Sequence, residues 1–177
     1  MHLATSGWAA LGIAVLSCRN PIPPAGTPAS VKPASQASPK DDCEQLMDAV
    51  LPHAQEMLSK RREFHPFGAT MSRSNEIAQV GGWTGGEHPP SSDFIDLLED
   101  GFREGAAQGK YKATALVVDV RTIPPGKSAK QDAIAVRLDH TDNYSVQVIY
   151  PYSFGASGAL VLEEPFAVRG EGRIFDR

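Results

Sequence analysis

The stretch DAIAVRLDHTDNYSVQVIYPY, residues 132–152, decides the fold of this chain. Apolar side chains alternate with polar or small ones on both sides of DHTDN (139–143), which is typical of strands that bury one face. Asp and Asn favour turns because their side chains bond the local backbone. The stretch therefore predicts a β-hairpin with strands at 132–140 and 144–150. The apolar positions of its two strands are Ile134, Val136, Leu138, Tyr144, Val146, Val148 and Tyr150.

Two helices are expected upstream of this hairpin. Apolar residues recur at helical spacing over 42–62, and Pro52 is expected to kink or split that helix. The second helix follows Pro90, with Ser91 or Ser92 as its N-cap, and should end near Gly105 or Gly109.

Further strands are expected at 67–72, 76–80, 111–121 and 159–163, with loops at 81–90 and 153–158 and an irregular segment at 164–177. The predicted order is α-β-β-α-β-β-β. Because hairpins dominate, the fold class is α+β, with a mainly antiparallel sheet of about five or six strands and two helices. Roadblock and profilin-like folds share this order, which is an analogy of topology only.

The N-terminus has the features of a targeting signal. Residues 8–16 (WAALGIAVL) are apolar apart from one glycine, and the run is too short to cross a bilayer. Val15-Leu16-Ser17-Cys18 follows and resembles the lipobox of bacterial lipoproteins. The resemblance implies that 1–17 is a signal peptide and that Cys18 becomes the lipidated mature N-terminus. An ordinary cleaved signal, or a buried helix with an incidental cysteine, stays open.

Residues 18–40 are rich in Pro, Ala and Ser and are expected to form a tether, because proline fixes φ and removes a backbone donor. Residues 41–177 then form a single domain. All 21 acidic residues lie in that domain, and three of the 17 basic residues lie before it. A domain this acidic is a poor partner for nucleic acid.

Four segments resemble an uncharacterised family of small bacterial proteins: FHPFGATM (64–71), EHPPSSDFIDLL (87–98), DAIAVRLDHTDNYSVQVIYPY (132–152) and RGEGRIF (169–175). The resemblance implies a shared α+β domain and no particular chemistry.

Few residues carry a chemical signal. Glu87 and His88 lie in the glycine-rich loop 81–90, which could present an acid and a base to a ligand or could simply precede a helix. Asp119, on a strand of valines, is a candidate buried general acid or a structural partner of a basic neighbour. Cys43 could be a nucleophile only beside a base, and an incidental cysteine at the tether boundary is the favoured interpretation.

Aromatic residues beside the loops suggest a contact patch. Trp83, Tyr152 and Phe154 would form a binding patch if exposed together, and core if buried. The GKS at 126–128 lacks the upstream glycine of a phosphate-binding loop and follows two prolines, so a hairpin loop is the better account. Neither a metal nor a cofactor is expected.

These observations favour a non-enzymatic, lipid-anchored interaction module of the bacterial cell envelope. Its partners would be the membrane, through Cys18, and an envelope protein, through the sheet or the loops at 81–90 and 151–158. An envelope enzyme that uses Glu87, His88 or Asp119 is the first alternative. A cytosolic interaction domain is the second, should the N-terminus not be a signal.

Overall fold

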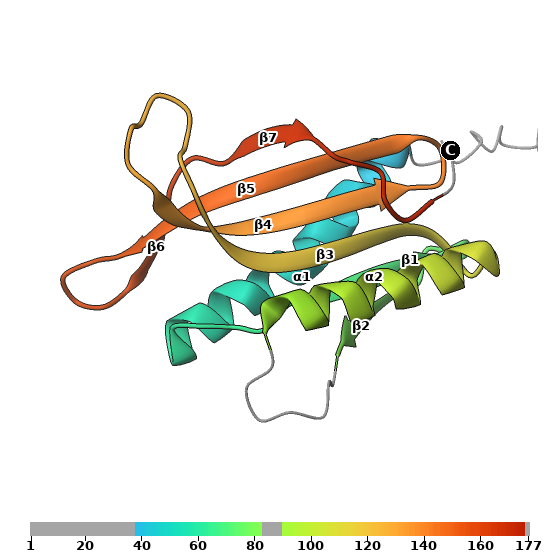
Figure 1. Ribbon diagram of the computed structural model, residues 1–177, viewed down its shortest axis with the longest axis horizontal. Helices are drawn as coiled ribbons and strands as arrows, with labels where there is room; N and C mark the ends of the chain where they lie inside the picture. The colour runs from blue at the N-terminus through green and yellow to red at the C-terminus, as the bar shows by residue number, and fades with distance from the viewer. Residues whose placement is uncertain (1–37, 83–89, 176–177) are drawn as a thin grey trace, which may run out of the picture. The chain divides into compact units, whose positions relative to one another are not determined.

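The computed structural model describes residues 38–82 and 90–175, and Figure 1 shows the arrangement of their elements. In chain order these are α1 (Pro39–Arg61), β1 (Phe67–Ser72), β2 (Ile77–Gly81), α2 (Ser91–Ala107), β3 (Tyr111–Thr122), β4 (Gln131–His140), β5 (Tyr144–Phe154), β6 (Leu160–Leu162) and β7 (Phe166–Arg169). Neither helix of this described part is long and apolar enough to cross a membrane.

All seven described strands join one antiparallel sheet in the order β2-β1-β3-β4-β5-β6, and β7 also pairs with β5. The predicted α+β class, with two helices and a mainly antiparallel sheet, is confirmed. The predicted count of five or six strands was too low. The hairpin of 132–152 lies at the centre of this arrangement, because β4 pairs with both β3 and β5.

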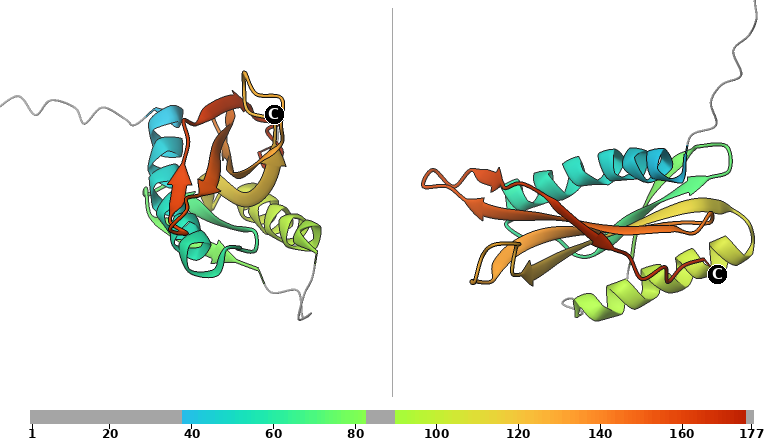
Figure 2. Two further views of the ribbon diagram at one scale, coloured as in Figure 1. Left: turned by 90° about the vertical axis from the view of Figure 1, so that its left-hand side faces the viewer. Right: turned by 90° about the horizontal axis from the view of Figure 1, so that it is seen from above.

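The two helices cover opposite faces of the sheet (Figure 2). Strand β3 shows why: Ala115 and Val117 pack in the core under α1, while Leu116 and Val118 pack in the core under α2. Successive side chains on a strand point to opposite faces, so an unbroken apolar run is required where both faces are covered.

Helix α1 begins at Pro39, three residues before the predicted start and two before the predicted domain boundary. Ser38 is the N-cap, and its hydroxyl accepts from the Asp41 N–H while the Asp41 carboxylate accepts from the Ser38 N–H. Proline at the first helical position costs nothing, because its missing N–H has no partner there. Pro52 is exposed and leaves α1 as one continuous element, so the predicted split does not occur.

Helix α2 begins at Ser91, and its N-cap is Pro90, which offers no side-chain hydrogen bond. The prediction that Ser91 or Ser92 caps the helix was therefore wrong, since both serines lie inside its first turn. Only the boundary was wrong, because the buried residues Phe94, Leu98 and Phe102 follow the expected helical spacing.

Two predictions at the end of the sheet were also wrong. Strand β5 runs to Phe154, so the predicted loop at 153–158 starts later. Residues 166–169, expected to be irregular, form β7 and pair with residues 146–149 of β5. Strands β6 and β7 thus share the edge of β5 that faces away from β4.

A buried polar cluster fixes the start of α1 beside the β4–β5 turn. Asp42 is 3% exposed, and its Oδ2 accepts from Lys112 Nζ at 2.6 Å and lies 3.2 Å from His140 Nε2. Nδ1 of His140 accepts from the Asp142 N–H at 3.0 Å, so Nε2 carries the proton that His140 donates to Asp42. At the other end of α1, Arg62 reaches Phe154, at the far end of β5.

Candidate partner-binding surface

Two of the predicted aromatic residues lie next to each other at the end of β5. The ring centroids of Tyr152 and Phe154 are 5.7 Å apart with planes at 72°, an edge-to-face contact. Tyr152 is 5% exposed and belongs to the core, whereas Phe154 is 37% exposed. The two rings are therefore not exposed together: Tyr152 is core, as one of the two interpretations required, and only Phe154 is exposed.

The exposed ring of Phe154 is paired with a cation. The guanidinium carbon of Arg62 lies 4.0 Å from the ring centroid. This distance is well within the range of a cation–π contact, and it holds two long side chains in one arrangement at the surface. Arginine and aromatic residues, phenylalanine among them, are enriched at the cores of protein–protein interfaces.

Asp119 lies beside the buried Tyr152. The phenol hydroxyl donates to Oδ1 and Oδ2 of Asp119 at 3.1 and 3.2 Å. Asp119 is an exposed residue, so the expectation of a buried carboxylate was wrong. Partial burial of the carboxylate nevertheless raises its pKa, and the charge of Asp132 raises it further.

A cleft of about 400 Å³ opens next to Asp119. Its floor and walls are Glu63, Phe64, His65, Ser91, Asp119, Val120, Arg121 and Asp132. His65 is fixed in place by stacking on Phe94, with ring centroids 5.0 Å apart, and Arg121 Nε lies 3.0 Å from a carboxylate oxygen of Asp132. The lining contains three carboxylates and one guanidinium, so the cleft is complementary to a cationic or hydrogen-bond-donating group.

We call Arg62, Asp119, Tyr152, Phe154 and this cleft the distal surface. It lies where α1 ends, at the same end of the sheet as the β5–β6 hairpin (Figure 1). The start of α1 lies beside the β4–β5 turn, at the other end of the strands. At about 1.5 Å per helical residue, Asp42 and Arg62 are separated by roughly 30 Å along α1.

The remaining predicted residues divide into two groups. Cys18, Trp83, Glu87 and His88 lie outside the described residues. Cys43 is 1% exposed and packs in the core under α1, so it is no incidental cysteine of a tether boundary. Burial, followed by the charges of nearby Asp42 and Asp139, raises the pKa of its thiol to about 12. The thiol is therefore protonated at neutral pH and unsuited to nucleophilic attack.

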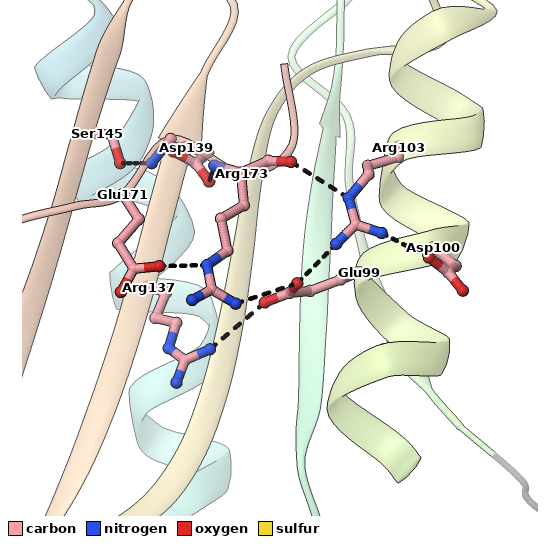
Figure 3. A network of polar contacts seen from close by, with 9 residues as sticks. Glu99, Asp100, Arg103, Arg137, Asp139, Ser145, Glu171 and Arg173 are labelled. Atoms are coloured by element: carbon pink, nitrogen blue, oxygen red, sulfur yellow. Dashed lines mark hydrogen bonds and ion pairs between the residues drawn. The ribbon is translucent and has the colours of Figure 1, made fainter. Parts of the chain in front are cut away.

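The sequence did not reveal the largest ionic network of the described residues, which centres on Glu99 of α2 (Figure 3). Glu99 is 3% exposed, and its carboxylate lies 2.8 Å from Arg103, 3.4 Å from Arg137 and 3.9 Å from Arg173. The Glu99–Arg103 pair has the i,i+4 spacing that a sequence can reveal. The other two arginines come from distant positions, and only the folded sheet brings them to Glu99.

Among the described residues, no three His, Cys, Asp or Glu side chains are arranged to hold a metal ion. No protein-family model, no curated protein and no solved structure matches the chain.

The titration of Asp119 tests the geometry of this surface. Tyr152→Phe should raise the pKa of Asp119, because it removes a hydrogen bond that stabilises the carboxylate. Asp132→Asn should lower it, because it removes a nearby negative charge. The carboxyl carbon shift of Asp119, followed by NMR between pH 2 and about 8, measures both effects. Shifts in the same direction in the two variants would contradict this arrangement.

The raised pKa of Asp119 also makes the free energy of unfolding depend on pH. The folded state holds the carboxyl proton of Asp119 more tightly than the unfolded state does. Folding is therefore accompanied by proton uptake at pH values between 3.8 and the raised pKa. The contribution of Asp119 is thus most favourable below that pH and is lost as the pH rises through the raised pKa. Unfolding curves of wild type and Asp119→Asn should diverge in this window.

Proposed function

We propose that this protein is a lipid-anchored interaction module of the bacterial cell envelope, and that the distal surface contacts a protein partner. The observation that carries the proposal is the exposed Arg62–Phe154 pair beside the acidic cleft at Asp119. An aromatic residue fixed by a cation, next to a cleft of defined charge, is the combination expected of a binding hot spot.

The anchor and the distal surface fit together in this proposal. If Cys18 carries the lipid, the 20 residues from Arg19 to Ser38 join it to the start of α1. At about 3.1 Å per residue this tether reaches up to roughly 60 Å. Within the domain, the distal surface lies about 30 Å along α1 from this attachment point.

Site-specific photo-crosslinking in the cell tests this surface. Placing a photoreactive residue at Phe154 should capture a discrete envelope protein, and placing it at Ile77 should not. Ile77 is the matched control, because it is also 37% exposed and lies on β2, next to the β1–β2 turn. The photoreactive residue at position 154 is an aromatic one, so that a ring is kept there. Arg62→Glu, combined with this probe, should reduce the captured product at least tenfold, since it removes the cation over the ring.

Two outcomes would contradict the proposed surface. One is equal capture from Phe154 and Ile77, which would indicate random encounters. The other is capture from Phe154 that is unaffected by Arg62→Glu in a protein whose circular dichroism is unchanged.

A second candidate function is an envelope enzyme that uses Asp119 as a general acid. It is favoured by the raised pKa of Asp119 and by the cleft that Asp119 shares with His65. Asp119→Asn separates the two candidates. An enzyme would lose its biological activity while keeping capture through Phe154, whereas an interaction module would lose both together.

Two finer inferences remain proposals. If the N-terminus is not a signal peptide, the proposed function becomes that of a cytosolic interaction domain. The analogy with roadblock and profilin-like topologies concerns architecture alone and adds nothing to the proposed function.

A further inference from the structure

His140, the last residue of β4, connects the β4–β5 turn to the first turn of α1, which lies at the same end of the sheet (Figure 1). The residue is 3% exposed, and its ring uses both nitrogens. Nδ1 accepts from the Asp142 N–H at 3.0 Å, and Nε2 lies 3.2 Å from Oδ2 of Asp42. A neutral imidazole has one nitrogen that accepts and one that donates, so both contacts are satisfied only while the ring is uncharged.

Groups of both charges surround this imidazole ring. On α1, Oδ2 of Asp42 also accepts from Nζ of Lys112 on β3, whereas Oδ1 has no hydrogen-bond partner among the described residues. In the turn, a carboxylate oxygen of Asp142 lies 3.8 Å from Nδ1. Arg73, from the β1–β2 turn, lines the adjoining cleft, and Tyr144 on β5 is the residue paired with the histidine. A charged imidazolium would thus have one carboxylate near each ring nitrogen.

Hydrogen bonds from the backbone hold residues 141–143 between β4 and β5. The Thr141 N–H donates to the carbonyl of Lys112 at 2.9 Å, and the Asp142 N–H donates to the ring of His140. Asn143 has φ +58°, a conformation that is less favourable for asparagine than for glycine. The turn therefore depends on these bonds to keep its shape, and losing the bond from Asp142 should free it.

We propose that His140 is a pH-sensitive latch on the β4–β5 turn. In acid, a proton from solvent in the adjoining cleft of about 350 Å³ binds Nδ1, which then can no longer accept from the Asp142 N–H. The amide of Asp142 turns away, its carboxylate accepts the new N–H, and residues 141–143 leave their place. Nε2 still donates to Asp42, now as a charged donor, so the start of α1 stays fixed. The proposal is independent of the lipid anchor and of the distal surface.

The neighbouring groups confine the change to the turn. Asp139 and Ser145 pair with each other on either side of it, and their side chains accept from the N–H groups of residues 173 and 172. Asp139 points away from His140, because successive side chains on a strand point to opposite faces. The thiol of Cys43 stays protonated, since burial raises its pKa to about 12. Among these groups, only histidine ordinarily changes its charge between about pH 5 and about pH 8.

The test is NMR of the full chain between about pH 8 and about pH 5. The amide shift of Asp142 should follow the ring titration of His140. The protection of this amide against hydrogen exchange should fall about tenfold, as expected for the loss of one hydrogen bond, while the amides of α1 keep theirs. His65 is the control, because its ring stacks on Phe94 and lines the cleft of the distal surface. Its titration should leave the Asp142 amide unchanged.

His140→Asn is the matched variant. An asparagine side chain can accept from the N–H two residues ahead, as Nδ1 does here, but it does not titrate, so the Asp142 amide should stay protected in acid. An Asp142 amide that ignores the titration of His140 in wild type would overturn the proposal, as would a ring that stays uncharged down to about pH 5. So would the same loss of protection in His140→Asn, or a simultaneous loss throughout the domain, which would indicate global unfolding. If the variant does not fold, the wild-type comparison with His65 still decides.

Discussion

Gly68→Ala should destabilise the domain by about 3 kcal/mol or more, at the upper end of overpacking substitutions. A Cβ at this position would lie 2.3 Å from the carbonyl oxygen of Ala115 and 2.7 Å from Cζ of Phe102. The carbonyl belongs to β3, the direct neighbour of β1, and cannot retreat without disturbing strand pairing. Phe102 is 2% exposed and fixed by the core under α2. Urea unfolding followed by circular dichroism measures the loss.

Gly81→Ala is the matched control for this substitution. Gly81 also lies in a strand, on β2, and a Cβ there meets no atom of the described residues within 4 Å. Its free energy of unfolding should stay within about 0.5 kcal/mol of wild type. Similar losses in the two variants would contradict the close packing of α2 against β1.

The sequence predicts the secondary structure best where the packing of side chains in the core requires apolar residues at a regular spacing. Residues 131–154 alternate because one face of β4 and β5 packs under α1, and the turn residues 141–143 fix where the hairpin reverses. Helix α2 is predicted for the same reason, since its buried residues repeat at helical spacing. In α2 the periodicity of the sequence and the periodicity of burial are the same, whereas β4 is buried on both faces and only the size of its side chains alternates.

The errors occur where neighbouring elements decide the structure. Strand β7 is four residues long and mostly exposed, so no alternation marks it, and it exists because it pairs with the open edge of β5. Pro39 was assigned to the tether, because a proline-rich composition does not show that Ser38 and Asp41 form a capping box.

The candidate surface was only partly predictable. Asp119 and Phe154 were identified from their residue type, but their relation depends on the registers of two strand pairs. Asp119 pairs with Ile134, and Ile134 pairs with Tyr150, which brings the side chain of Tyr152 next to Asp119. The role of Arg62 depends on where α1 ends relative to β5, which no local pattern indicates.

Cys18→Ser should abolish membrane association of the full chain. The proposed modification attaches a diacylglyceryl group to the Cys18 thiol. Two acyl chains anchor a protein stably, whereas one chain gives only marginal binding, at about 0.8 kcal/mol per buried CH₂. Serine has no thiol to modify, and three basic residues in 1–40 are too few to hold the chain on anionic lipid.

The most direct measurement is metabolic labelling with a palmitate analogue, followed by separation of membrane and soluble fractions. Cys43→Ala is the control, because it removes a cysteine that is 1% exposed and leaves Cys18 in place. The proposal predicts label and membrane association in wild type and Cys43→Ala, and neither in Cys18→Ser. An unlabelled wild-type protein that stays in the cytosol with residues 1–17 attached would contradict it.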